Sequence, residues 1–276
     1  MENYQIQLRV FIVLSLLWFG PVSCDAFKPS PYNCDNTPEI YQNLPSSIGY
    51  MFILWRPASQ TAAGFEEQLM AFLDTEPASL DGLNLKLMLQ QPQIESITLR
   101  NRPLEDGSLV AALIAIGLAS QADAILVSQL FESITSFVAA YVVERQVPRD
   151  YTRTWADGET SAGIQQVSFL YRKTGMEDQA FQDYWFCAHT PFALETHPIW
   201  RYERNQVLAV LTPDAPQFDG IVGLQMEQVS DLTDLLVFLG GNIFNGIRVQ
   251  IDVQNFLNLD LIQVAAMKEV IISSDF

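Results

Sequence analysis

Histidine, cysteine and basic residues are all scarce in this chain. Lys and Arg together number 15 against 32 Asp and Glu, which gives a formal net charge of −17. A protein this acidic repels nucleic acid and anionic lipid, so we expect no nucleic-acid partner and no membrane partner beyond an N-terminal lipid anchor. The acidic residues are spread along the chain rather than gathered in a tail, which indicates a solubilising surface rather than a cation-binding segment.

The motifs of cofactor and metal chemistry are also missing. The sequence contains no phosphate-binding glycine loop, no dinucleotide fingerprint, no G-x-S-x-G elbow and no H-x-x-x-H or C-x-x-C spacing. Its two histidines, His189 and His197, are separated by a proline-containing stretch that is poor spacing for chelation. We therefore expect neither a metal nor a bound cofactor. The sequence does not exclude a Ser-His-Asp catalytic triad whose residues are far apart in the chain.

The apolar run at residues 10–19 is too short to span a bilayer, which needs about 20 apolar residues. It follows Arg9 and is ended by Gly20 and Pro21, as in an export signal. We expect residues 1–24 to be a signal peptide and the mature chain to be secreted or periplasmic. An uncleaved anchor is the competing interpretation. A third is lipidation of Cys24, because residues 22–24 partly resemble a lipobox.

Two further cysteines, Cys34 and Cys187, remain after such processing. Exported proteins tolerate disulfides, so these two could pair. The alternative is a free thiol at Cys34 and a small buried apolar side chain at Cys187.

After a Pro- and Asn-rich arm at residues 25–47, the same order of elements occurs twice. Residues 48–163 and 164–276 each predict β-α-β-β-α-β, the ferredoxin-like unit, with a connector at residues 148–163. Strands are predicted at 50–55, 83–89, 108–116, 137–143, 167–171, 202–211, 220–226 and 264–272, and helices at 65–73, 121–134, 176–188 and from about 231. The fold class is thus α+β, with two tandem units whose sheets face each other as an intramolecular barrel. Such a chain needs no partner copy, so we expect a monomer.

The stretch from Tyr171 to Asn205 carries the most specific pattern. A strand ends in a basic turn, a helix bears Phe181 and Tyr184-Trp185, and a His-x-Pro step follows at His189. Over residues 164–273 this pattern resembles the EthD domain of the dimeric α/β-barrel superfamily. The resemblance implies a superfamily that includes cofactor-free monooxygenases, cyclases, isomerases and haem enzymes. The first unit lacks these signatures and resembles a diverged, inactive copy.

Histidine titrates near neutral pH, so His189 is our candidate general acid/base, in a pocket between the sheet and the first helix of the second unit. Tyr184 or Tyr202 would orient a substrate oxygen. The candidate ligand-binding residues are Trp185, Phe192, Trp200 and Asn205. The structural alternative makes His189 a helix C-terminal residue that stabilises the dipole, and the aromatic residues plain core. We expect no role for His197.

The function predicted from the sequence is an exported, cofactor-independent enzyme. It would oxygenate, cyclise, dehydrate or isomerise a small apolar molecule that bears a carbonyl or aromatic group. A non-catalytic binding or scaffold protein is the first alternative. A haem protein with His189 as axial ligand is the second.

Overall fold

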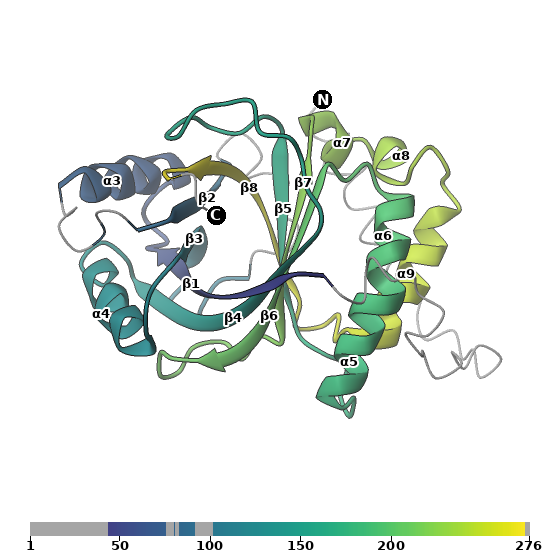
Figure 1. The fold of residues 1–276 in the computed structure, drawn as a ribbon, viewed down its shortest axis with the longest axis horizontal. Helices are drawn as coiled ribbons and strands as arrows, with labels where there is room; N and C mark the ends of the chain where they lie inside the picture. Colours follow the sequence, from purple (N-terminus) through teal and green to yellow (C-terminus); the bar gives the residue numbers. More distant parts are fainter. Residues whose placement is uncertain (1–43, 76–79, 81–82, 92–101, 274–276) are drawn as a thin grey trace.

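The computed structural model describes residues 44–75, 80, 83–91 and 102–273. The predicted signal peptide, Cys24, Cys34 and most of the predicted N-terminal arm lie outside these residues. The described strands form a closed antiparallel barrel in the order β1-β3-β2-β8-β5-β7-β6-β4 (Figure 1). No helix among the described residues is long and apolar enough to cross a membrane.

Each half of the barrel is a ferredoxin-like unit, which confirms the predicted element order. The N-terminal half comprises β1 (Ser46–Arg56), α3 (Ala62–Thr75), β2 (Leu85–Gln90), β3 (Leu109–Ile116), α4 (Gln121–Phe131) and β4 (Phe137–Arg149). The C-terminal half comprises β5 (Ile164–Leu170), α5 (Asp178–Tyr184), η5 (Trp185–His189), α6 (Thr190–Thr196), β6 (Arg201–Val210), β7 (Gly220–Met226), α7 (Val229–Thr233), α8 (Leu235–Phe238), α9 (Asn245–Phe256) and β8 (Gln263–Ile271). The two strand orders, β4-β1-β3-β2 and β8-β5-β7-β6, are equivalent.

The two sheets face each other, as predicted, and they are also joined at both edges. Strand β4 pairs with β6 along one seam, and β2 pairs with β8 along the other. The sequence pattern did not reveal these seams. Joining them is favourable because an open edge strand leaves a row of N–H and C=O groups without partners.

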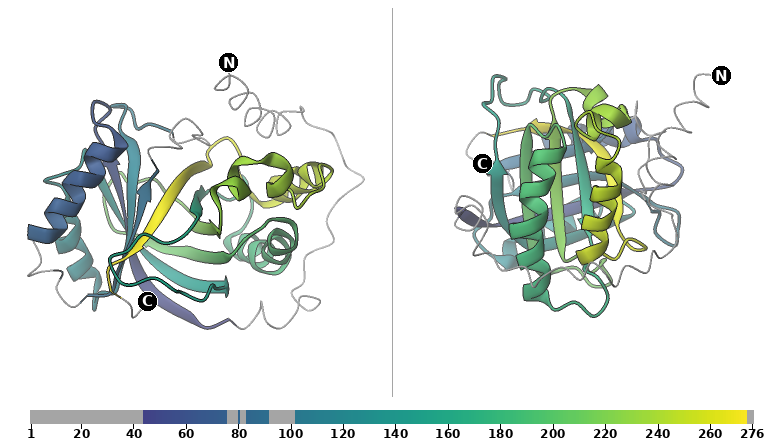
Figure 2. Two further views of the ribbon diagram at one scale, coloured as in Figure 1. Left: turned by 90° about the horizontal axis from the view of Figure 1, so that it is seen from above. Right: turned by 90° about the vertical axis from the view of Figure 1, so that its right-hand side faces the viewer.

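Alternation along each strand divides the side chains between two layers. In β1, Phe52 and Leu54 pack outward against α3 and α4, while Ile53 and Trp55 point into the barrel. The helices of the C-terminal half cover the outer face of their own sheet in the same way (Figure 2). The fold therefore has three separate apolar cores: one under each helical layer and one inside the barrel.

Several element boundaries differ from the prediction, among them the end of β4, which extends to Arg149 and into the predicted connector. Strand β1 begins at Ser46, inside the predicted arm. The predicted helix from about residue 231 is broken into α7, α8 and α9. The break between α8 and α9 falls at Gly240 and Gly241, which adopt φ values of 64° and 78° that interrupt a right-handed helix.

Candidate functional site

A π-helical turn carries the predicted acid/base. Elements α5, η5 and α6 form one continuous helix from Asp178 to Thr196, longer than the predicted helix at 176–188. Pro191 has no N–H to donate to the carbonyl four residues earlier, so the helix widens there. The Thr190 N–H donates to the Trp185 carbonyl, and the Thr190 hydroxyl donates to the same oxygen at 2.8 Å. Such π turns occur frequently at functional sites.

Within this turn, His189 is oriented by a carboxylate from α9. Its Nδ1 lies 2.5 Å from Oδ2 of Asp252, and the other oxygen of Asp252 accepts from the Tyr184 hydroxyl at 3.1 Å. Asn255 donates to the same hydroxyl at 2.9 Å. One carboxylate therefore positions both the imidazole and the phenol, two of the three residues predicted to be catalytic.

The His189 ring is supported by packing while its second nitrogen stays available. The ring centroid lies 4.9 Å from that of Phe256, which in turn stacks on Tyr184 at 5.1 Å. No described residue makes a hydrogen bond to Nε2, and 17% of the His189 side chain is exposed. Because α6 continues to Thr196, His189 is not at a helix C-terminus, so the dipole-stabilising alternative does not fit.

No role was predicted for Asp252 from the sequence. Asp252 and Phe256 are four residues apart on α9, so they share the helix face that meets η5. That spacing in the sequence could have indicated that Asp252 and Phe256 lie on one face of α9 and contact a neighbouring helix. It could not show which residue of the other helix the carboxylate would meet.

Trp185 and Tyr202 lie between the helix and the sheet, both fully buried. The Trp185 indole N–H donates to the Tyr202 hydroxyl at 3.1 Å. The Trp185 ring occupies the space beside Gly220, where an added Cβ would stand 2.5 Å from the ring. Burial raises the pKa of Tyr202, so its phenol stays protonated at neutral pH. This packing gives both residues a core role in positioning η5 on the sheet.

The remaining predicted ligand-binding residues are dispersed. Phe192 packs under the guanidinium of Arg248, 5.0 Å from the ring centroid. Trp200 packs on Tyr151, which belongs to the connector between the halves, and the two ring centroids are 4.8 Å apart. Asn205 points into the barrel, where its amide nitrogen lies 3.3 Å from Oε1 of Glu203. The structure therefore does not gather these three around His189.

His197, for which no role was expected, is a buried structural residue. Its Nδ1 donates to the carbonyl of Phe238 at 2.8 Å, and its ring packs on the Phe238 ring at 4.3 Å. Burial lowers the pKa of His197 to about 4. The neutral ring thus fastens the end of α6 to α8.

This burial predicts an acid-sensitive contribution to stability. Unfolding returns His197 to a pKa of about 6.5, so between about pH 6.5 and 4 the unfolded chain binds the extra proton and stability falls as pH falls. From about pH 7.5 to about pH 5 the loss should be roughly 2 kcal/mol. The variant His197→Asn keeps an amide donor but cannot titrate. Urea unfolding of both proteins should show a stability difference that shrinks toward pH 5, and parallel pH profiles would contradict a buried neutral His197.

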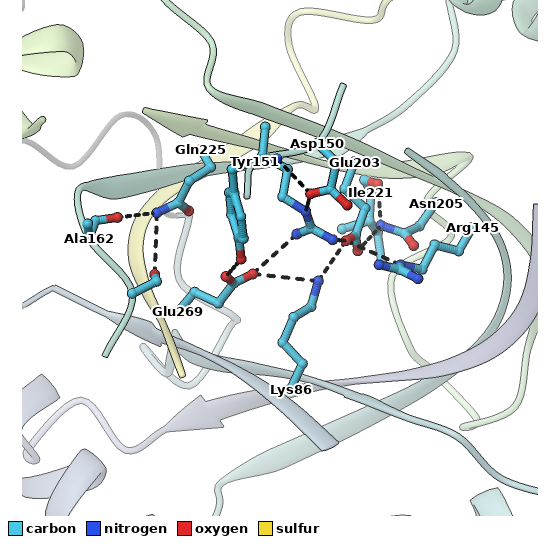
Figure 3. Close-up of polar contacts among 12 residues, drawn as sticks. Lys86, Arg145, Asp150, Tyr151, Ala162, Glu203, Asn205, Ile221, Gln225 and Glu269 are labelled. Carbon is cyan, nitrogen blue, oxygen red and sulfur yellow. Dashed lines mark hydrogen bonds and ion pairs between the residues drawn. The ribbon is translucent and has the colours of Figure 1, made fainter. Parts of the chain in front are cut away.

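A second polar cluster, which sequence reasoning missed, lies inside the barrel (Figure 3). Oε2 of Glu203 accepts from Lys86 at 2.6 Å and from Arg201 at 2.6 Å, and lies 3.2 Å from Nε of Arg145. Oε2 of Glu269 lies 3.2 Å from Arg201 and 3.7 Å from Lys86. Lys86 and Arg145 belong to the N-terminal half and the other three to the C-terminal half. We call these five residues the barrel ion cluster.

The ionisation states in this cluster follow from burial and mutual charge. Burial opposes ionisation of Glu203, but Lys86, Arg145 and Arg201 outweigh it and hold the pKa of that carboxyl well below its usual range. Burial also lowers the pKa of Lys86, an effect that Glu203 partly offsets. Burial and the negative charge of Glu269 raise the pKa of Tyr151, whose hydroxyl donates to that carboxylate. Tyr151 thereby ties the connector to the end of the barrel.

The charges of this cluster are largely neutralised by one another. We therefore interpret it as a set of ion pairs that holds the two halves together rather than as a reaction site. Its signal in the sequence was Lys86, the one charged residue in the predicted strand at 83–89, where residues 85–89 are otherwise apolar. The described residues contain no group of three His, Cys, Asp or Glu side chains that could hold a metal.

Cys187, in the π turn, is disulfide-bonded. The other cysteines of the sequence, Cys24 and Cys34, both precede the described residues. The predicted pairing of Cys34 with Cys187 therefore stays a prediction. The bond excludes the alternative of a reduced, purely apolar Cys187.

Comparison with known proteins supports the assignment of the C-terminal half. Residues 173–259 match the EthD domain. No curated protein matches the sequence. An anthrone oxidase-like protein has a similar structure, with a TM-score of 0.52 and 9% identity over 84% of this chain and 98% of that chain.

Two weaker structural similarities were also found. A chlorite dismutase variant from Candidatus Nitrospira defluvii has a TM-score of 0.41 and 11% identity over 83% of this chain and 94% of that chain. A protein from Fusobacterium nucleatum subsp. nucleatum named as a monooxygenase has a TM-score of 0.45 and 5% identity over 83% of this chain and 93% of that chain. At these identities the similarity concerns the fold alone. The EthD match, from Lys173 to Leu259, includes Tyr184, His189 and Asp252.

Proposed function

We propose that this chain, which carries an EthD domain on a dimeric α/β-barrel fold, is an exported enzyme in which His189 moves a proton on a small apolar substrate. The substrate class is an apolar compound that bears a carbonyl or aromatic group. No cofactor takes part in the proposed proton transfer. The observation that carries the proposal is the contact between His189 and Asp252.

This contact prepares Nε2 of His189 to act as a base. The Asp252 carboxylate accepts from Nδ1–H, so the basic lone pair of a neutral ring is on Nε2, which has no partner among the described residues. Nε2 would take a proton from a C–H bond next to a carbonyl. The electron pair would remain on the substrate as an enolate, and the imidazolium formed would be stabilised by Asp252. Tyr184 donates its one hydroxyl proton to the same carboxylate, so its role would be to position Asp252.

Return of the proton to another carbon completes an isomerisation, whereas O₂ as co-reactant turns the same enolate toward oxygenation. Because one structural neighbour is an anthrone oxidase-like protein, anthrone is a suitable first probe. Anthrone and O₂ together yield anthraquinone and water, a balanced four-electron oxidation in which one oxygen atom enters the product and the other leaves as water. The methylene protons of anthrone are acidic because the carbanion formed by their loss is conjugated with the carbonyl.

The test measures O₂ uptake and anthraquinone absorbance with purified protein and anthrone, and deuterium uptake into anthrone in D₂O without O₂. Proton transfer predicts enzyme-dependent deuterium uptake even when oxidation is prevented. A panel of apolar carbonyl compounds extends the test if anthrone is not turned over. No accelerated exchange with any member would contradict a proton-transfer enzyme and favour a binding or scaffold protein.

The same geometry supports a second candidate. A histidine that donates Nδ1–H to a carboxylate and leaves Nε2 without a partner is also the arrangement of many metal-ligating histidines. His189 would then be the axial ligand of a haem group, which would supply redox chemistry. A Soret band in protein purified from haem-supplemented cells would favour this candidate. A colourless protein under those conditions would leave the proton-transfer function as the better explanation.

Export is part of the proposal, supported by the apolar run at residues 10–19 and by the disulfide at Cys187, which an oxidising compartment favours. The intact mass of the native protein should correspond to a chain that begins near Asp25, or at a lipid-modified Cys24. Reduction should add the mass of two hydrogens. An intact, unmodified Met1 in a cytosolic fraction would contradict export.

A further inference from the structure

Helices α8 and α9 lie on the outer edge of the C-terminal half (Figures 1 and 2), and several of the apolar residues in this segment are exposed. On α9 and the turn before it, Phe244, Ile247 and Ile251 occupy one helix face, with 71%, 58% and 51% of their surfaces exposed. Leu236, Val237 and Ile243 are also exposed close by in sequence. We call these six residues the α8–α9 stripe. Clustered exposed apolar residues of this kind mark interaction surfaces.

The stripe differs in charge from the rest of the molecule. Residues 235–251 contain no Asp or Glu, although the chain has 32 of them, and Arg248 is their only charged residue. The net charge of −17, from which we expected no membrane partner, is therefore an average that does not describe this segment. An apolar surface with a single basic residue can meet a lipid interface without electrostatic repulsion.

The shape of the stripe also favours a lipid surface over a second copy of the chain. Gly240 and Gly241 turn the chain tightly between α8 and α9, and the turn presents Ile243 and Phe244 to solvent. A protruding turn with apolar side chains at its tip can insert between lipid headgroups. A second copy would need a complementary hollow to receive it, whereas a bilayer deforms around it.

We propose that the α8–α9 stripe docks on the surface of an electrically neutral lipid bilayer. Phe244, Ile247 and Ile251 enter the boundary between headgroups and acyl chains, and Arg248 lies at the level of the lipid phosphates. Helix α9 also carries Asp252, directly after Ile251, so docking holds the His189 site close to the lipid from which an apolar compound would leave. The docking itself does not depend on the catalytic role of His189.

Co-sedimentation with phosphatidylcholine vesicles tests the proposal, with the processed chain that the sequence predicts to begin near Asp25. The wild-type protein should sediment with the vesicles. The double variant Phe244→Ser with Ile247→Ser should bind the vesicles at least about tenfold more weakly, because it loses two apolar side chains that would be buried in the bilayer. Leu126→Ser on α4 is a matched control, since Leu126 is 61% exposed and lies in the other half. That control should bind like the wild type.

A second readout distinguishes docking from a change in the fold. In the variant Phe244→Trp, vesicles should shift the additional tryptophan emission to shorter wavelength, and the unfolding midpoints of all variants should match the wild type. Equal vesicle binding by the double variant, or no binding by the wild type, would overturn the proposal. So would a wild-type dimer in sedimentation velocity that the double variant converts to monomer, because the stripe would then belong to a second copy.

Discussion

Replacing His189 by alanine should lower turnover of a responsive substrate by about 10²–10⁴-fold, the usual loss when a general acid/base is removed. The fold should persist, because the side chain is partly exposed and the π turn is held by the bond from Thr190 to Trp185. Steady-state kinetics together with thermal unfolding of the same variant give both quantities. Added imidazole should restore part of the activity, since it supplies the missing base.

The other members of the site and the second histidine supply the controls. Asp252→Asn keeps the shape but replaces the carboxylate that orients Nδ1 and stabilises the imidazolium, so turnover should fall and its pH profile should change. Tyr184→Phe removes the hydroxyl that donates to Oδ1 of Asp252, so the carboxylate is held less firmly and turnover should fall. His197→Asn should retain activity at neutral pH. Unchanged turnover in a folded His189→Ala protein would remove proton transfer from the function of this site.

Replacing Glu203 by glutamine should destabilise the barrel by about 3–5 kcal/mol, the typical cost of removing one partner from a buried ion pair. The change removes the charge of the carboxylate that Lys86, Arg145 and Arg201 share, while Glu269 still pairs with Lys86 and Arg201. Equilibrium urea unfolding measures the loss. The conservative shape of glutamine separates loss of charge from loss of volume.

A double-mutant cycle assigns this cost to the pairing of the two halves. Lys86→Met removes the buried cation opposite Glu203, so the double variant should lose less stability than the sum of the single changes. Asp157→Asn is the matched control, because its pair with Arg153 lies at the surface and should contribute at most about 1 kcal/mol. Additive losses for Lys86 and Glu203 would show that the cluster does not couple the halves.

The sequence determined the local architecture of this protein. The apolar run of β1, the alternation of β2 and the helical spacing of α3 are properties of consecutive residues, and patterns of this kind predicted the element order of both halves. The residue pattern from Tyr171 to Asn205 resembled the EthD domain, and the match of residues 173–259 to that domain confirms the resemblance. The length of the helix that carries His189 was predicted wrongly: the prediction ended it at residue 188, whereas the π turn accommodates Pro191 and the helix continues to Thr196.

Only the tertiary structure decided which faces meet. Asp252 is 63 residues from His189, and Glu203 is 117 residues from Lys86. Periodicity shows that a residue lies on a buried or an exposed face of its own element, but it carries no information about the residue opposite. The register of the β4–β6 and β2–β8 seams and the packing of α9 on η5 bring these pairs together. Such pairings depend on the packing of the whole molecule, so the candidate site and the barrel ion cluster became visible only in the folded chain.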